Sequence, residues 1–299
     1  MTTVTLRHLL VAAALLGGCT STQSAVQTPD TTVSTAPKVD CGPAIPGMEA
    51  LLKPAAFIVL GEMHGTQEAP AFTTQLACHA ASAGQPVRVE FEIAVEEQPR
   101  IDAFLASGDG ALQLLTASEF WTRSFQDGRS SKAMLQALVR LRELKRAGLP
   151  LEVRAFDVGA VGGKDRDASM AEKLVQERAQ APRDTFVVLV GNLHARRDKG
   201  APWDPNLRFM TNHLLEAEPG LVALDMAYLG GSIWACMGQT DDACKVHPLK
   251  KPRYEEHAAT PRIVLQKDGP EDAYDGVYGV GTANASPPAV QAASAQPTP

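Results

Sequence analysis

The sequence predicts an α/β fold with a central, mostly parallel sheet, helices on both faces, and helical and hairpin insertions. Short apolar runs rich in β-favouring residues alternate along the chain with longer segments of helical periodicity. The runs 56–60 and 186–190 contain no charged residue, which is typical of strands that helices cover on both faces. The 299 residues, 44% of them hydrophobic, are enough for one large domain or two small ones.

The expected elements follow one another in a regular order. Strands are expected at 56–60, 87–91, 151–156, 185–190 and 221–226, with further strands at 232–236 and 262–266. Helices are expected at 68–82, 98–105, 132–147, 167–180 and 206–217. The less regular segments 111–130 and 229–260 are expected as insertions over one edge of the sheet.

The first 40 residues have the pattern of a lipoprotein export signal. The apolar stretch 9–16 is too short to span a bilayer and has the length of a signal-peptide core. The following Leu16-Gly17-Gly18-Cys19 resembles a bacterial lipobox, which implies a signal peptide over 1–18 and a lipid on Cys19. Thr20 in place of Asp favours the outer membrane, so we expect an anchored protein facing the periplasm. An ordinary secretory signal is the alternative.

Composition also sets the outer limits of the folded domain. Residues 19–40 are rich in Thr, Ser, Gln and Pro and are expected to be a flexible tether that begins at the lipidated cysteine. Residues 283–299 are mostly Ala, Ser, Pro and Gln and are expected to be disordered. The α/β domain is therefore expected over 41–282.

The domain contains four cysteines, and an oxidising periplasm permits disulfides. Cys236 and Cys244 flank a turn rich in Gly and Asp, so we expect them to pair first, which leaves Cys41 with Cys78. Four cysteines allow three connectivities, and the absence of CxxC spacing makes a metal-binding quartet the weaker interpretation.

Charge and motifs exclude several functions. The net charge of −6 gives no basic excess, so a nucleic-acid partner is not expected. The chain lacks a dinucleotide fingerprint after the first strand, a phosphate-loop lysine, a GxSxG nucleophile elbow and an HExxH helix. A hydrolytic site in this chain would therefore use an activated water.

Polar residues directly follow several of the apolar runs. In an open α/β sheet these positions lie at the carboxyl ends of the parallel strands, where ligands bind. Two segments carry the main signal: Gly61-Glu62-Met63-His64-Gly65 and Gly191-Asn192-Leu193-His194-Ala195-Arg196. Imidazole takes a proton near neutral pH or binds a metal, and a neighbouring carboxylate orients it or shares the metal. Either histidine alone would also fit a structural role.

The other expected strands end in further candidates. Glu90 and Glu92 lie on one face of the second strand with Arg88, so either carboxylate could reach the site, or Glu92 could pair with Arg88. The predicted catalytic or metal-binding set is Glu62, His64, Glu90 and His194. Arg196 is expected to stabilise an oxyanion if it points inward. Asp157 could instead cap the segment that follows it.

The two histidine segments and the Glu90 strand end resemble the ChaN-like, Tiki and erythromycin-esterase superfamily over about 57–228. Asp127-Gly128-Arg129 and Arg166-Asp167 with Met170 are similar to intervening pieces of this group. The resemblance implies a mainly parallel α/β sheet. Tiki-like members are metal-dependent proteases, erythromycin-esterase-like members are hydrolases that use His and Glu, and ChaN-like members are lipoproteins linked to haem-iron uptake.

Two functions follow from these observations. The leading hypothesis is a periplasm-facing lipoprotein hydrolase of ester or peptide bonds, with a divalent metal as a possible cofactor. The alternative is a haem- or iron-binding lipoprotein without turnover, in which Tyr228 would be the haem ligand. Expected partners are the membrane, through the lipid anchor, and a small-molecule, peptide or haem ligand. A module that keeps the fold without the chemistry is a third possibility.

Overall fold

The computed structural model describes residues 39–107, 111–238, 240, 243–259, 261–266 and 273–290. The expected signal peptide, Cys19 and nearly all of the tether lie outside the described residues. No helix in the described ranges is both long enough and apolar enough to cross a membrane.

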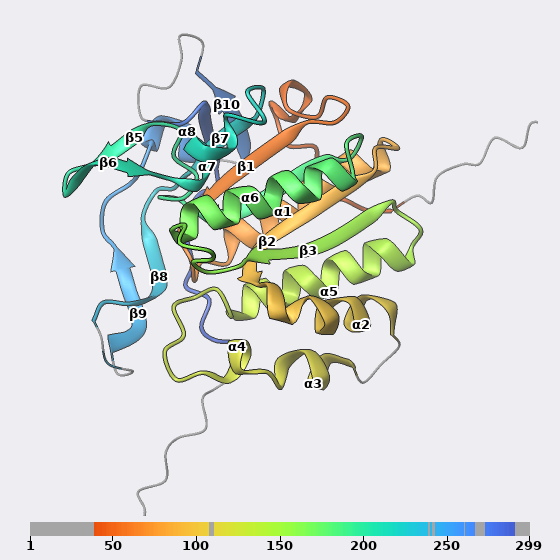
Figure 1. Cartoon of the computed structure of the whole chain (residues 1–299), viewed down its shortest axis with the longest axis horizontal. Coiled ribbons are helices and arrows are strands. Elements are labelled where there is room, and N and C mark those ends of the chain that lie inside the picture. Colours follow the sequence, from red (N-terminus) through yellow and green to blue (C-terminus); the bar gives the residue numbers. More distant parts are fainter. Residues whose placement is uncertain are drawn as a thin grey trace, which may run out of the picture. The chain divides into compact units, whose positions relative to one another are not determined.

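A seven-stranded sheet forms the centre of the α/β domain, as predicted (Figure 1). Its order is β10-β11-β7-β1-β4-β2-β3, and all neighbours are parallel except β10 and β11. The strands are β1 (Phe57–Glu62), β2 (Val87–Ala94), β3 (Leu151–Asp157), β4 (Thr185–Gly191), β7 (Val222–Ala227), β10 (Arg262–Leu265) and β11 (Gly276–Gly279). β1 lies at the middle of this order, and its six residues are all buried.

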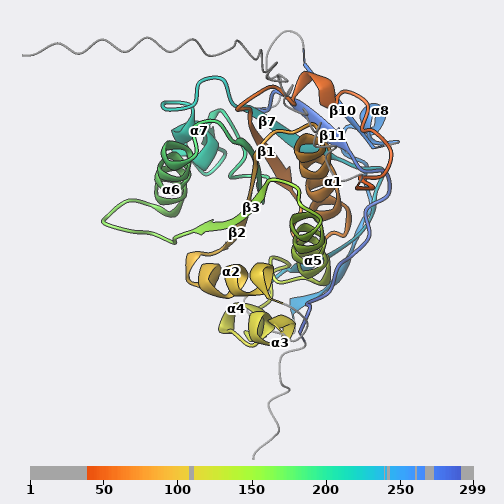
Figure 2. The same cartoon turned by 90° about the vertical axis from the view of Figure 1, so that its right-hand side faces the viewer.

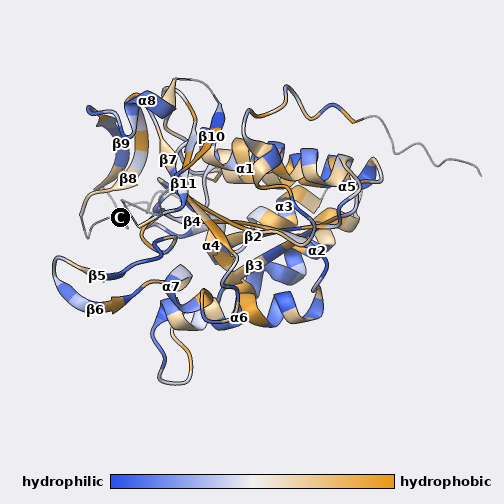
Figure 3. Cartoon of the chain, turned by 90° about the horizontal axis from the view of Figure 1, so that it is seen from above, coloured by the Kyte–Doolittle hydropathy of each residue, from blue (hydrophilic) through white to orange (hydrophobic). Residues whose placement is uncertain are grey.

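Helices cover both faces of this sheet (Figure 2). One face carries α1 (Glu68–Ser82), α2 (Gln98–Ala106) and α5 (Lys132–Arg146), and the other carries α6 (Arg166–Gln180) and α7 (Met210–Leu214). Each face of the sheet has its own hydrophobic core, and alternate residues of β1 belong to one or the other. Ile58 and Leu60 pack toward α1 and α5, while Phe57 and Val59 pack toward α6 and α7. The strands between the helices are largely hydrophobic in colour (Figure 3).

Strand β2 departs from this apolar pattern on one face. Val89 and Phe91 belong to the core under α1 and α5, whereas Arg88, Glu90 and Glu92 alternate with them and face α6. The sheet therefore carries a row of buried ionisable side chains on this side, and the last of them, Glu92, lies at its carboxyl edge.

The insertions form short helices and two separate hairpins. The expected irregular segment 111–130 contains α3 (Ala111–Thr116) and α4 (Glu119–Thr122). β5 (Lys199–Ala201) pairs with β6 (Asp204–Arg208), so most of the long helix expected over 206–217 is wrong; only α7 is helical there. β8 (Gly231–Cys236) pairs with β9 (Cys244–Leu249) outside the main sheet. Three short helical turns complete the described elements: η1 (Met48–Ala50), η2 (Val95–Glu97) and α8 (Glu255–Ala258).

Both predicted disulfides are present. Cys41 pairs with Cys78 and ties the N-terminal arm to α1, and Cys236 pairs with Cys244 at the end of the β8–β9 hairpin. Disulfides fit an exported protein, because the cytosol keeps thiols reduced.

The expected disordered tail is wrong for its first eight residues. Residues 283–290 run over the domain and form isolated bridges from Ala285 to Thr66 and from Pro288 to Ser131. Ser286 is buried and its hydroxyl accepts a hydrogen bond from the backbone N–H of Ala133. Small and proline residues suit this path because they pack against backbone without needing a core of their own.

Candidate functional site

Parallel pairing of β1 with β4 places the two histidine segments side by side at the carboxyl edge of the sheet. Glu62 is in register with Gly191, and the backbone N–H of Asn192 donates to the carbonyl of Glu62 at 2.9 Å. Two buried tyrosines donate hydrogen bonds to backbone carbonyls at these strand ends. Tyr278 donates to the Gly61 carbonyl at 2.9 Å, and Tyr274 donates to the Asn192 carbonyl at 2.7 Å.

His64 lies between two carboxylates. Its Nδ1 atom is 2.9 Å from Oε1 of Glu62, and its Nε2 atom is 3.3 Å from Oε2 of Glu92. Burial alone would lower the pKa of His64, but the charges of Glu92 and Glu62 outweigh it and raise the pKa to about 10. Because ionised carboxylates only accept hydrogen bonds, both ring nitrogens donate, and His64 is an imidazolium at neutral pH.

Gly191 is required by the closeness of this imidazole. A Cβ atom at Gly191 would lie 2.9 Å from Nε2 of His64, which is too close for a side chain. The backbone N–H of Gly191 donates to Oε2 of Glu92 at 2.8 Å. The glycine at the end of β4 therefore leaves room for His64 and holds its carboxylate partner.

Glu92 takes the position that we predicted for Glu90. Glu90 is completely buried below the edge, beside Glu177 and Arg88, and neither of its carboxylate oxygens has a hydrogen-bond partner. Burial and the charge of Glu177 raise its pKa to about 8. The two glutamates share one strand face, so only the later one reaches the carboxyl end. Arg88, which the sequence allowed as an alternative partner of Glu92, pairs instead with Glu177 at 2.5 Å.

Two arginines hold Glu92 from the solvent side. Nη2 of Arg166 lies 2.5 Å from Oε1 of Glu92, and Nη1 of Arg129 lies 3.4 Å from the same oxygen. Both arginines also pair with Asp157 at the end of β3, and Arg129 pairs with Asp127. Burial would raise the pKa of Glu92, but His64 and the surrounding cations hold it well below its usual range.

His194 lies at the other side of Arg166. Its Nδ1 atom is 2.7 Å from Oδ1 of Asp167, and its Nε2 atom is 2.9 Å from Nη1 of Arg166. A guanidinium has no acceptor, so Nε2 of His194 must accept, and its proton lies on Nδ1 facing Asp167. The same Asp167 oxygen accepts from the backbone N–H of Met210 at 2.6 Å, which fixes the carboxylate.

The two histidines therefore belong to one network but carry their protons differently. The chain of contacts runs from His64 through Glu92 and Arg166 to His194. The side chains of His64, Arg166 and His194 are 22%, 31% and 21% exposed, so each can touch a ligand. The side chains of Glu62 and Glu92 are only 3% exposed and contact His64 from the buried side.

Arg196 does not point into this network. Its guanidinium pairs with Asp198 at 2.5 Å and lies over the ring of Phe209 at 5.4 Å from the ring centroid. The turn after His194 rotates the chain away from the edge, and Arg166 from the first turn of α6 takes the place that we expected for Arg196.

Tyr228, expected as a haem ligand, follows β7 on the far side of β1 from Glu92. It is buried, its backbone exchanges hydrogen bonds with Arg253, and burial raises the pKa of its phenol. The nearby Asp225 is held by Arg253 and by Tyr254. No contact among the described residues joins Tyr228 to His64 or His194.

The donor set at His64 does not fit a divalent metal. Both imidazole nitrogens face carboxylates, and the carboxylate of Glu92 already faces two guanidinium groups whose charge would repel a cation. In the described part of the chain, no group of three or more His, Cys, Asp or Glu side chains is arranged to hold a metal ion.

The arginines and aspartates of the network were missed as site residues. Asp127, Arg129, Arg166 and Asp167 come from a loop and from a helix start, whereas the prediction considered the residues that follow strands. The signal that pointed to them was the family resemblance of Asp127-Gly128-Arg129 and Arg166-Asp167, to which no chemical role was attached.

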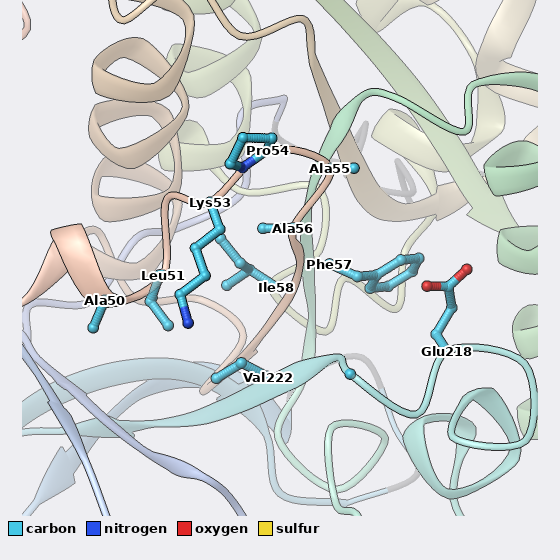
Figure 4. A pocket seen from close by; sticks show the side chains of 11 residues that line it. Ala50, Leu51, Lys53, Pro54, Ala55, Ala56, Phe57, Ile58, Glu218 and Val222 are labelled. Atoms are coloured by element: carbon cyan, nitrogen blue, oxygen red, sulfur yellow. The ribbon is translucent and has the colours of Figure 1, made fainter.

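A cavity of about 270 Å³ lies at the opposite, amino-terminal edge of the sheet (Figure 4). Apolar residues before and within β1 and β7 line most of it, with Lys53 and Glu218 as its charged side chains. Glu218 is paired with Arg178. The cavity brings no histidine or cysteine together and is separate from the His64 network.

Comparison with known proteins shows the fold. No family model matches the sequence, and no curated protein matches it. Among solved structures, a histidine mutant of erythromycin esterase EreC in its open conformation aligns with a TM-score of 0.60 at 12% identity, covering 78% of this chain and 92% of that one. The chain shares its fold with this esterase.

Two further solved structures resemble this chain in fold. A succinoglycan biosynthesis protein aligns with a TM-score of 0.53 at 8% identity, over 84% of this chain and 95% of that one. A Bacillus cereus protein aligns with a TM-score of 0.50 at 10% identity, over 81% and 92%. At these identities the likeness extends to the arrangement of the sheet and helices, and the chemistry rests on this chain's own residues.

Proposed function

We propose that this protein hydrolyses ester or peptide bonds with a water molecule that His194 activates. The observation that carries the proposal is the different setting of the two histidines, which Glu92 and Arg166 join. His64 lies between two carboxylates, which favour its charged form, whereas Nε2 of His194 faces a guanidinium, which favours a nitrogen that accepts. Settings that separate two groups of one residue type in this way are how proteins assign general acid and general base roles. The erythromycin esterase fold supports a hydrolase.

His194 has the geometry of a general base. Asp167 accepts from Nδ1, so the lone pair on Nε2 faces Nη1 of Arg166, and the ring is 21% exposed. A water that replaces Nη1 of Arg166 would donate its proton to this lone pair. The hydroxide then attacks the carbonyl carbon, and the leaving group takes the proton back from His194 when the tetrahedral intermediate collapses.

The cationic groups would stabilise the negative charge that develops on the carbonyl oxygen. His64 is held as an imidazolium by Glu62 and Glu92, and Arg166 is held by Glu92 and Asp157. Arg166 would give up its contact with His194 when the water binds but would keep its contacts with Glu92 and Asp157, so its charge stays beside the reacting carbonyl. The sequence offered His64 and His194 as alternative general bases, and in this proposal His64 is an electrostatic partner instead.

Hydrolysis of nitrophenyl esters of increasing acyl length and of a peptide library tests the proposal. We expect His194→Asn to lose at least a hundredfold in kcat, because an amide cannot take the proton. His257→Asn is the matched control, since the ring of His257 lies 3.6 Å from exposed Glu256 and is not part of the His64–His194 network. Full activity in His194→Asn, or no hydrolysis of any substrate by the parent, would refute it.

We also propose that Cys19 anchors the protein to the outer membrane on its periplasmic side. The lipobox resemblance and the two disulfides support this location. Labelling of cells with a radioactive fatty acid should mark the parent protein but not Cys19→Ser. Equal labelling of both proteins would reject Cys19 as the lipid acceptor.

A further inference from the structure

Two glycine turns of the candidate site touch each other backbone to backbone. Gly65 follows His64, and Gly128 lies between Asp127 and Arg129. A Cβ atom at Gly128 would lie 2.5 Å from the backbone nitrogen of Gly65, and both glycines have positive φ angles of 103° and 79°. The separation of these two loops therefore sets how His64 and Arg129 meet at Glu92.

Trp234 of strand β8 bonds to both loops at once. Its backbone N–H donates to the carbonyl of Gly65 at 3.0 Å, and its indole Nε1–H donates to the carbonyl of Gln126 at 2.8 Å. A Cβ atom at Gly65 would lie 2.1 Å from the Trp234 carbonyl oxygen, so the backbone of β8 presses directly on the His64 turn.

The β8–β9 hairpin that carries Trp234 does not belong to the main sheet. β8 pairs with β9 along Gly231–Cys236, and the Cys236–Cys244 disulfide closes the pair two residues beyond Trp234. At its other end, β8 is bridged to Ala283 of the C-terminal segment. Because a lone two-stranded hairpin is marginally stable, the disulfide is well placed to keep Trp234 in position.

We propose that Trp234 is a positioning residue, which fixes the His64 turn against the Arg129 loop, and that the Cys236–Cys244 disulfide maintains this arrangement. The indole N–H bonds to the carbonyl of Gln126, the residue just before the Asp127–Arg129 turn, and Sγ of Cys236 lies 3.4 Å from the same oxygen. The hairpin thereby determines whether Glu92 can accept from His64 and Arg129 together. The kinetic consequence rests on the proposed hydrolase function, but the structural consequence does not.

The substitution Trp234→Phe keeps an aromatic ring and the backbone bond to Gly65 but removes the indole N–H. We expect backbone amides of 63–67 and 126–131 to exchange with deuterium about tenfold faster, the scale of one lost hydrogen bond. Amides of 57–61 in β1 should not change. The matched control is Trp203→Phe, because Trp203 is 69% exposed and lies at the turn between β5 and β6.

The double variant Cys236→Ser/Cys244→Ser tests the second half of the proposal, with Cys41→Ser/Cys78→Ser as its control. We expect the first pair to speed exchange in the same two loops and the second pair to leave them unchanged. If Trp234→Phe fails to fold, this comparison still decides the proposal. Unchanged exchange in both loops, or an equal increase in β1, would overturn it.

The kinetic readout separates this proposal from the hydrolase proposal. If the parent hydrolyses a substrate, Trp234→Phe should lower kcat with little change in KM, since the residue acts on geometry and not on binding. If the parent hydrolyses nothing, the exchange result still tests the role of Trp234. Only the exchange data can reject the positioning role.

Discussion

Arg166 donates from Nη1 to Nε2 of His194 across 2.9 Å, which fixes the proton of His194 on the opposite ring nitrogen. The same guanidinium holds Glu92 and Asp157 through its other nitrogens. A residue at the first turn of α6 therefore connects the ends of β2, β3 and β4. This connection explains how two histidines that do not touch can act in one reaction.

Replacing Arg166 tests this connection. Arg166→Met should lower kcat about 10²- to 10³-fold, the usual effect of removing one fixed donor from a developing oxyanion. Arg196→Met is the matched control and should keep its activity, because Arg196 pairs with Asp198 away from the network. Steady-state kinetics on the best ester substrate measures both, and equal losses in the two variants would contradict the assignment.

The buried Glu90 should make the protein less stable at alkaline pH. Burial raises its pKa in the folded protein to about 8 from an ordinary value of 4.5. The folded state then binds more protons than the unfolded state between pH 4.5 and 8, so the free energy of unfolding falls across this range. Glu90→Gln removes the charge and should stabilise the protein by about 2 kcal/mol above pH 8.

Urea unfolding at pH 5, 7 and 9 measures this effect. Glu97→Gln is a suitable control, since Glu97 is also buried but accepts a hydrogen bond from Ser118 at 2.7 Å. That variant should lose stability, because it weakens a satisfied bond. An unchanged pH slope in Glu90→Gln would show that Glu90 is not the group responsible.

Activity should survive removal of divalent metals. The carboxylates around His64 are already paired with cationic groups, and a bound metal would have to displace Arg166 or Arg129. Dialysis against a chelator followed by an activity assay and elemental analysis provides the measurement. Loss of activity that zinc or manganese restores would contradict this prediction and favour the metal-dependent hydrolase expected from the sequence.

The C-terminal segment 283–290 should be essential for a stable site. The Ser286 backbone N–H donates to the Gly65 carbonyl at 2.7 Å, and the Ala289 N–H donates to the Ser130 carbonyl at 2.9 Å. Truncation after Thr282 removes both bonds and should lower the melting temperature by several degrees, since each is worth about 1 kcal/mol. Truncation after Val290 is the control and should change little.

The sheet and both disulfides were predictable because they depend on local pattern. The apolar runs of β1 and β4 are long and uninterrupted, and Cys236 and Cys244 are separated by one short turn. The helix expected over 206–217 failed at its start because two prolines and a tryptophan at 202–205 form the turn of a hairpin, whose second strand runs on to Arg208.

The site was only half predictable, for a geometric reason. The residues Glu62, His64 and His194 follow strands, and parallel pairing brings strand ends together. The choice between Glu90 and Glu92 depends on where β2 ends. The alternation of strand residues places both glutamates on one face but does not show which of them lies at the end of the strand. Arg129 and Arg166 reach the edge from other elements, so their place depends on tertiary packing.

The protonation of the two histidines is the most direct test of the account. Nitrogen-15 NMR of the imidazole rings, assigned with His64→Gln and His194→Asn, should be recorded at pH 8. We expect both nitrogens of His64 to be protonated, as its pKa of about 10 requires, and His194 to carry its proton on Nδ1 alone. A neutral His64 at that pH, or a proton on Nε2 of His194, would contradict the assignment of the base and its cationic partner.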